Sequence, residues 1–250
     1  YSGKIAFANT FAFLFATRAL EMVRTHLCYG EANVKLMAAY AGLSDSFDGP
    51  THHAITDVAI MRALPRMCVV IPADGIAIDG LLPQVAAWPG PVYFRLNRNE
   101  VPVIYDAAFT PTIGKAHVVR EGDDVTIISN GIMLARSLAA AEELHARGLE
   151  ARVLDMHTVK PLDREAVLDA ARQTGAIVTA EEHSVVGGLG SAVAEVTGED
   201  LPVPVVRVGI GDRFAETGPY ALLLDRYGMA IEDVIAGAER AIAAKRRVFV

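Results

Sequence analysis

The sequence predicts an α/β fold with two open, doubly wound and mostly parallel sheets. Short apolar runs of strand length alternate with longer helical patterns, which is typical of parallel strands that helices cover on both faces. A length of 250 residues and a hydrophobic share of 52% are enough for two domains with sizeable cores. Between two series of strands, residues 97–115 lose all periodicity and contain two prolines, which indicates a connecting segment.

The first series contains four strands with helical segments between them. The clearest helical pattern covers residues 51–64, where Ile55, Val58 and Met61 fall on one face. The predicted strands are "IAFAN" (5–9), "VKLMAAY" (34–40), "MCVVIPA" (67–73) and "PVYFRL" (91–96).

The second series repeats this alternation. One helix, over 163–174, has a readable start, because Pro161 precedes Asp163, whose side chain can cap the first turn. The predicted strands are 124–130, 150–157, 176–182 and 203–210, and the other helices are 133–147, a segment from 188, and the C-terminal end. We expect a first domain over 1–105 that lacks its start, a linker over 106–120, and a second domain over 121–250.

The composition excludes several classes of partner. There are 23 basic and 30 acidic residues, a net charge of −7, which argues against nucleic acid. With only Cys28 and Cys68, no disulfide framework is expected, and a reducing, cytoplasmic setting is the default. No apolar run has the length of a membrane span, and Asn9 and Thr10 interrupt the apolar opening at 4–19, which disfavours a signal peptide.

The loop "SDSFDGPTHH" (44–53) concentrates polar side chains after a predicted strand. Its Gly-Pro pair forbids a continuous helix, so Asp48 and His52 cannot form a helical metal pair, and His52 and His53 point in different directions. No metal site is predicted. Two interpretations remain: Asp48 or Thr51 caps the next helix, or the loop lies where ligands bind in parallel sheets and its residues contact a substrate.

Other motifs are ambiguous by themselves. The glycine-rich turn in 183–195 could cradle a phosphate, but its spacing fits no known phosphate loop, and turn formation is the simpler interpretation. Arg95 and Arg98 lie at the exit of a predicted strand and could clamp an anion. The phenylalanines of "TFAFLF" are expected in the core.

Taken together and in this order, several segments resemble the C-terminal half of transketolase, in particular the separate C-terminal subunit of two-subunit transketolases. The resemblance implies a domain that binds the aminopyrimidine of thiamine diphosphate, followed by the family's C-terminal domain. It also implies transfer of a two-carbon ketol unit from a ketose to an aldehyde acceptor. The segments are "GKIAFANTFAFLFATRALEMVR", "GLSDSFDGPTHH", "MRALP", "VYFRLNR", "HTVKPLD", "EEHSVVGGLGSAVAE" and "VGIGDRFAETG".

The resemblance assigns cofactor contacts to the segment after the first strand. Phe11 corresponds to the ring that the family places against the aminopyrimidine. The family's second aromatic residue corresponds to Leu14, so Phe13 or Phe15 is the candidate substitute. Arg18 is expected near the same pocket.

The resemblance also assigns substrate contacts. Asp48 corresponds to the aspartate that recognises a hydroxyl next to the reacting carbonyl, and His52 to the histidine that binds substrate oxygens and helps to move protons. We therefore expect both to be catalytic. Arg98 corresponds to the arginine that holds the terminal phosphate of the sugar.

Three positions depart from the family pattern at the expected substrate path. Tyr40 stands where the family has a histidine, and Ser46 and Phe47 replace a glycine and an acid. A bulkier and more apolar wall favours an unusual donor or acceptor, such as a modified or sulfonated sugar.

The resemblance further implies a second polypeptide. The family holds the diphosphate and Mg²⁺ in its N-terminal domain, and the glutamate that activates the cofactor lies upstream of the position of Tyr1. We expect an active site shared with an N-terminal transketolase subunit, in an α₂β₂ assembly with a large apolar interface. The alternatives are the β subunit of a 2-oxoacid dehydrogenase E1 and a non-catalytic subunit of a transketolase-like complex. A deoxyxylulose phosphate synthase shares the loop but fits less well, because it is normally one long chain and the residues around the loop resemble transketolase more.

Overall fold

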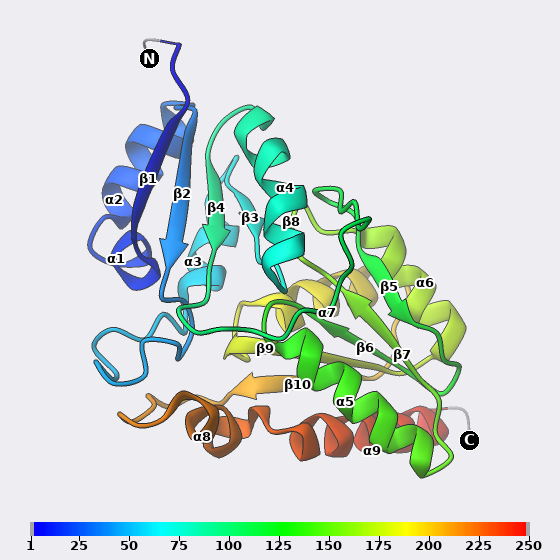
Figure 1. The fold of residues 1–250 in the computed structure, drawn as a ribbon. Helices are drawn as coiled ribbons and strands as arrows, with labels where there is room; N and C mark the ends of the chain where they lie inside the picture. Colours follow the sequence, from blue (N-terminus) through cyan, green and yellow to red (C-terminus); the bar gives the residue numbers. More distant parts are fainter. Residues whose placement is uncertain (1–2, 249–250) are drawn as a thin grey trace.

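Two five-stranded sheets lie side by side in the computed structural model, which describes residues 3–248 (Figure 1). In each sheet four strands run parallel and one edge strand runs antiparallel, which confirms the predicted α/β class. The first sheet has the order β1 (Ala6–Phe11), β2 (Val34–Ala39), β4 (Val92–Arg95), β3 (Cys68–Val70), β8 (Thr158–Lys160). The second has the order β10 (Val205–Ile210), β9 (Ile177–Ser184), β6 (Val125–Ser129), β7 (Ala151–Asp155), β5 (His117–Arg120).

Helices cover both faces of the second sheet. One pair, α5 and α9, packs together on one face, and another pair, α6 and α7, packs together with the other face (Figure 1). Asp163 caps α6 as predicted, because its carboxylate accepts the Ala166 N–H. The helices are α1 (Ala12–Ala16), α2 (Leu20–Met22), the π-helix η1 (Val23–Tyr29), α3 (Asp57–Ala63), α4 (Gly75–Ala87), α5 (Met133–Ala146), α6 (Arg164–Thr174), α7 (Leu189–Asp200), α8 (Tyr220–Leu224), the π-helix η2 (Asp225–Met229) and α9 (Ile231–Val248).

The helix predicted over 51–64 starts later than expected. It begins at Asp57, and its N-cap residue is Thr56, so neither Asp48 nor Thr51 caps it. That interpretation was wrong because the loop continues through a short antiparallel bridge, in which the Ala54 N–H donates to the Gly42 carbonyl. The residues before α3 are therefore held by tertiary contacts and not by helix geometry.

Two short strands were not foreseen. The strand β5 lies inside the expected linker, so the last residues of that segment belong to the second sheet. The strand β8, which comes from the second half of the chain, pairs with β3 and completes the first sheet. Both are only a few residues long and carry polar side chains, so neither produces an apolar run in the sequence.

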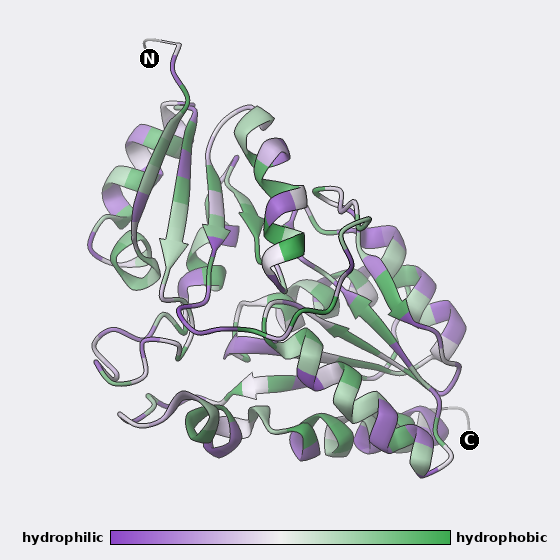
Figure 2. Cartoon of the chain, viewed as in Figure 1, coloured by the Kyte–Doolittle hydropathy of each residue, from purple (hydrophilic) through white to green (hydrophobic). Residues whose placement is uncertain are grey.

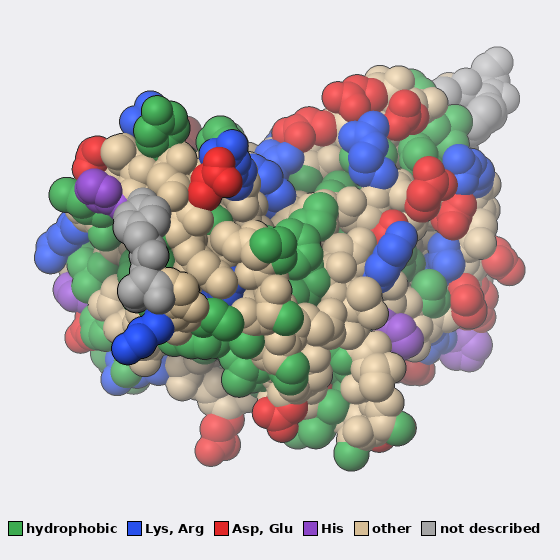
Figure 3. Space-filling view, turned by 90° about the horizontal axis from the view of Figure 1, so that it is seen from above, with side chains coloured by type: hydrophobic (Ala, Val, Ile, Leu, Met, Phe, Trp, Pro, Cys, Tyr) green, Lys and Arg blue, Asp and Glu red, His purple; other side chains and the backbone are tan. Residues whose placement is uncertain are grey.

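One buried cluster of apolar side chains extends from the first sheet to the second. Phe94 of β4 and Val70 of β3 belong to the same buried cluster as Ile127 of β6. Figure 2 shows the hydrophobic colouring concentrated on the strands and the hydrophilic colouring on the outward helix faces. On the face drawn in Figure 3, acidic and basic side chains are intermixed with apolar ones. Within residues 3–248, no helix is both long and apolar enough to cross a membrane.

A buried ion pair fixes the start of α3. Arg95, at the end of β4, donates from Nε to Asp57 Oδ2 at 2.7 Å, and the Tyr93 hydroxyl donates to the same oxygen at 2.8 Å. From Nη2, Arg95 also donates to the carbonyls of Ala54 and Glu182, at 3.1 and 3.0 Å. Burial by itself would raise the pKa of Asp57, but Arg95 outweighs it and holds that pKa below its ordinary value. The pair thus links both sheets to the loop before α3.

Candidate functional site

The carboxyl ends of β1, β2 and β4 meet at one edge of the first sheet. Phe11 is the last residue of β1 and lies opposite Ala39 in the ladder, so Tyr40 follows at the same level. This edge is where ligands bind in open parallel sheets. A cleft of about 450 Å³ lies there and is lined by Asn9, Thr10, Phe11, Ala39, Tyr40, Asn97 and Arg98.

Aromatic rings gather beside this cleft. The ring centroids of Phe11 and Tyr40 are 4.4 Å apart, and those of Phe13 and His52 are 4.9 Å apart in an edge-on contact. His52 also lies 6.0 Å from Phe11, centroid to centroid, so the loop brings the predicted catalytic histidine to the predicted cofactor ring. The Thr51 hydroxyl is 2.9 Å from His52 Nδ1.

Tyr40 takes an uncommon backbone conformation at the end of β2. Its φ is +56°, a left-handed value that non-glycine residues rarely adopt and that tends to occur at functional sites. The ring lies between Phe11 and the guanidinium of Arg98, whose Cζ is 4.9 Å from the ring centroid. Tyr40 therefore forms a flat wall that packs against both groups.

Arg98 lies at the mouth of the cleft and is paired with an acid that sequence reasoning missed. Its Nη1 donates to Asp45 Oδ1, and the side chains are 46% and 0% exposed, respectively. Burial raises the pKa of Asp45, Arg98 opposes that rise, and the neighbouring Asp48 carboxylate adds to it. The presence of an acid three residues before Asp48 was the available signal, but its partner is far away in the sequence.

The remaining predicted cofactor residues divide into two groups. Phe13 contacts His52, and Arg18 lies over the Phe13 ring with its Cζ 5.7 Å from the centroid. Phe15 and Leu14 pack in or against the apolar cluster of the first sheet, to which Phe13 also belongs. Of the two candidate substitute rings, Phe13 is the one that reaches the cluster around the cleft.

The loop 44–53 rests on a segment from the second half of the chain. The Ser46 carbonyl accepts the Gly218 N–H at 3.1 Å, while the Phe47 side chain is 70% exposed. Gly49 has a φ of +77°, and a Cβ there would come within 2.4 Å of Thr217 Oγ1, so only glycine fits. These contacts hold Asp48 near Asp45 at the edge of the site.

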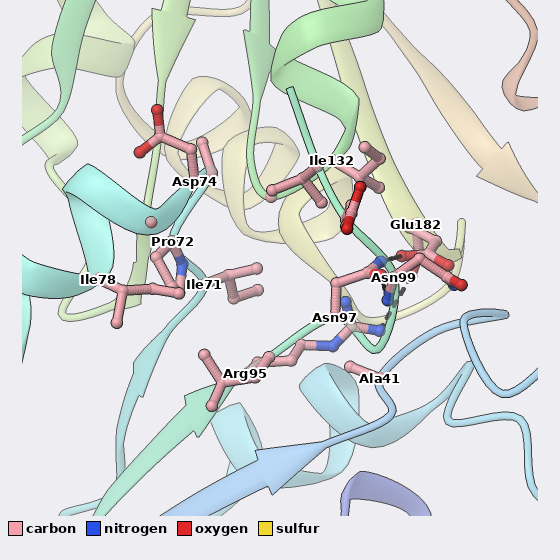
Figure 4. A pocket seen from close by; sticks show the side chains of 16 residues that line it. Ala41, Ile71, Pro72, Asp74, Ile78, Arg95, Asn97, Asn99, Ile132 and Glu182 are labelled. Carbon is pink, nitrogen blue, oxygen red and sulfur yellow. Dashed lines mark hydrogen bonds between the residues drawn. The ribbon is translucent and has the colours of Figure 1, made fainter. Parts of the chain in front are cut away.

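A second cavity, of about 240 Å³, lies between the two sheets (Figure 4). Asn97 and Glu182 point toward one another there, and the Asn97 amide donates to the Tyr220 hydroxyl at 2.6 Å. Burial raises the pKa of Glu182 to about 7, because the carboxylate form is poorly solvated in the interior. Asn97 lines both cavities, so this pocket adjoins the cleft.

The glycine-rich turn does not form a phosphate cradle. Glu181 Oε2 and Oε1 accept the N–H groups of Leu189 and Gly190, at 2.7 and 2.8 Å, at the start of α7. A carboxylate of the protein thus occupies the place that a bound anion would need. Among the described residues, no group of three or more His, Cys, Asp or Glu side chains is arranged to hold a metal ion.

Comparisons with known proteins agree over most of the chain. Residues 2–103 match the transketolase pyrimidine binding domain, and residues 114–234 match the transketolase C-terminal domain. The chain is 44% identical over 236 residues to the 6-deoxy-6-sulfo-D-fructose transketolase subunit SqwH of Clostridium sp. (strain MSTE9), covering 94% of this chain and 73% of that protein. It is 38% identical to an apulose-4-phosphate transketolase subunit of Phocaeicola vulgatus, covering 94% and 75%.

Solved structures give the same result. A split gene transketolase, described as an inactive β4 tetramer, superposes with a TM-score of 0.93 at 48% identity, over 98% of this chain and 78% of that one. A transketolase from Leishmania mexicana shares the fold with a TM-score of 0.75 at 21% identity, over 96% and 34%. With both domain matches in the expected order, the chain belongs to the transketolase family, in which it corresponds to the C-terminal subunit of the split enzymes.

Proposed function

We propose that the chain is the C-terminal subunit of a two-component, thiamine diphosphate-dependent transketolase. It would transfer a two-carbon ketol unit from a ketose to an aldose acceptor at a site shared with an N-terminal subunit. The observation that carries this proposal is that Phe11 and Arg98 line one cleft while His52 lies beside the Phe11 ring, although the three residues come from separate segments. An aromatic ring for a cofactor, a histidine for proton transfer and a guanidinium for an anion are the parts that this reaction requires.

The cleft fits the aminopyrimidine end of thiamine diphosphate. The Phe11 ring lines it, with Tyr40 and Phe13 packed around that ring, so a flat heterocycle has an aromatic surface to pack against. When bound, thiamine diphosphate supplies a stabilised carbanion for making and breaking the carbon–carbon bond. We assign the diphosphate and Mg²⁺ to the N-terminal subunit, in an α₂β₂ assembly.

The polar residues of this chain bind and orient the sugar. His52 Nε2 binds a substrate oxygen and exchanges a proton with it, while Nδ1 is held by Thr51. The Asp48 carboxylate, on the exposed part of the loop, accepts a hydrogen bond from a sugar hydroxyl. Arg98 holds an anionic group at the far end of the substrate, supported by the Tyr40 wall.

The residues around the site favour an unusual sugar as the substrate. The Tyr40 ring packs against the Phe11 ring, and Ser46 and Phe47 precede Asp48 in the loop. The relative at 44% identity is named as a 6-deoxy-6-sulfo-D-fructose transketolase subunit. We therefore propose a ketose or aldose with a modified terminus, such as a sulfonate.

Reconstitution tests the proposal. The full-length chain alone should bind no measurable thiamine diphosphate, because the proposed diphosphate site is in the partner, and mixing with a transketolase N-terminal subunit should restore binding. The inactive β4 tetramer of the split-gene relative is consistent with this requirement. Tight calorimetric binding by the isolated chain would contradict the shared site. A mixture that binds the cofactor but transfers no ketol unit from any ketose would favour a non-catalytic subunit, and one that decarboxylates 2-oxoacids would favour the E1 alternative.

A further inference from the structure

The surroundings of Arg98 hold more negative than positive charge. Arg98 is paired with Asp45, and the Asp48 carboxylate is close enough to raise the pKa of Asp45. One positive and two negative formal charges therefore lie together at this end of the cleft. The acid of the pair is 0% exposed while the guanidinium is 46% exposed, so Asp45 lies behind Arg98 and does not itself line the cleft.

The pairing leaves one edge of the guanidinium open. Within residues 3–248, the side-chain hydrogen bond of Arg98 is donated by Nη1, so Nε and Nη2 are free to donate to a ligand. These two groups point in parallel and can meet two oxygens of one anion. The backbone N–H of Arg98 donates to Ser44 Oγ at 3.2 Å, and the ring of Tyr40 supports the guanidinium, so this edge is held in a fixed place.

One carboxylate oxygen of Asp45 accepts no hydrogen bond from residues 3–248. Its Oδ2 is buried and, among the described residues, has no hydrogen-bond partner. A buried carboxylate oxygen without an N–H donor increases the negative potential around it, because the low-dielectric interior screens its charge poorly. That potential acts on any anion that Arg98 binds.

We propose that Asp45 is a specificity-determining residue, which makes the Arg98 subsite favour a singly charged terminus, such as a sulfonate, over a doubly charged phosphate. This inference rests on the proposed function, since it assumes that Arg98 holds the end of the sugar. A phosphate monoester carries a charge of about −1.5 to −2 at pH 7, and a sulfonate carries −1. Repulsion by Asp45 therefore opposes the phosphate about twice as strongly.

The charge of Asp45 can be removed with little change of shape. Asp45→Asn keeps an oxygen that accepts from Arg98 Nη1, so the guanidinium should stay in place. The ratio of kcat/KM for the phosphate-ended aldose to that for the sulfonate-ended aldose should rise about tenfold, the effect of one extra unit charge across a partly solvated gap. A merely structural role would lower both values together and leave the ratio unchanged.

The experiment uses the full-length chain assembled with its N-terminal subunit. Two aldoses of equal length, ending in phosphate or in sulfonate, are compared by turnover and by calorimetric binding. Glu143→Gln is the control, because it removes an acid at an exposed position of α5, in the second half of the chain, and it should leave the ratio as in the wild type. If Asp45→Asn does not fold, as judged by circular dichroism, Asp45→Ser removes the same charge with a smaller side chain.

The outcomes separate this inference from the proposed function. A tenfold gain for phosphate in the Asp45 variant, absent in the control, supports the inference. An unchanged ratio in a folded Asp45 variant, or no binding of either aldose to the wild-type complex, overturns it. Binding that follows the predicted ratio without any turnover would refute the transferase activity but retain the role of Asp45.

Discussion

Replacing Asp57 with asparagine removes the charge that balances Arg95 in the interior of the protein. The two side chains are 0% and 6% exposed, and Asp57 accepts from Arg95 Nε, Arg95 Nη2 and the Tyr93 hydroxyl, at 2.7, 3.3 and 2.8 Å. An unpaired buried guanidinium costs about 3–5 kcal/mol. We expect Asp57→Asn to lower the free energy of unfolding by that amount at pH 7, measured by urea denaturation followed by circular dichroism.

The pH dependence of the stability gives a second test of the Asp57–Arg95 pair. Because the folded-state pKa of Asp57 is below its ordinary value of 3.8, its stabilisation is complete above pH 3.8 and is lost as the pH falls through the folded pKa. The wild-type protein should therefore lose stability in acid, and the Asp57→Asn variant should lose less. Asp79→Asn, at an exposed position of α4, is the control and should change stability by less than about 0.5 kcal/mol.

A double-mutant cycle decides whether the pair itself is responsible. Arg95→Met removes the charge that Asp57→Asn leaves unbalanced, so the double variant should be more stable than the sum of the two single losses predicts. The coupling should reach about 0.5–3 kcal/mol, the range for residues in one hydrogen-bond or ion-pair network. Strictly additive losses would refute the argument, because they would mean that Asp57 and Arg95 stabilise the fold independently.

Three further changes test the site and the cavity between the sheets. Asp48→Ala should lower kcat/KM more for hydroxyaldehyde acceptors than for unhydroxylated ones, with a difference in transition-state stabilisation of about 1–3 kcal/mol. Equal losses for both acceptors would remove the proposed role of Asp48. His52→Ala should lower kcat by about 10²–10⁴-fold in the reconstituted complex, and a loss confined to KM would indicate binding only. The raised pKa of Glu182 should make the wild-type protein lose about 3 kcal/mol of unfolding free energy as the pH rises from 4.5 to 7. Glu182→Gln should abolish this loss. A wild-type stability that is flat over this window would contradict the raised pKa.

Much of the fold follows from local patterns. The strand β6 is buried along its whole length and is visible as the run "VTIIS", and the cap of α6 depends on Asp163 and a residue three positions away. The strand β8 depends instead on a partner about ninety residues earlier, in β3. Its three residues carry no pattern that would assign them to the first sheet.

Some residues of the site could likewise be predicted from the sequence, and others could not. Phe11 and His52 could be placed because their segments end strands or follow them, and strand ends converge in a parallel sheet. The pairing of Asp45 with Arg98 spans 53 positions and depends on how the loop folds back. Three of the residues predicted from the sequence, Phe11, Tyr40 and Arg98, therefore line the cleft, but the charge behind Arg98 requires the three-dimensional structure.

The position of β8 has a consequence for synthesis on the ribosome. The first sheet cannot acquire its last strand until Lys160 has emerged, long after the residues of β4. The exposed edge of β3 must wait unpaired during that interval, and unpaired strand edges are sites of aggregation. The two halves of this chain should therefore mature together during translation and not one after the other.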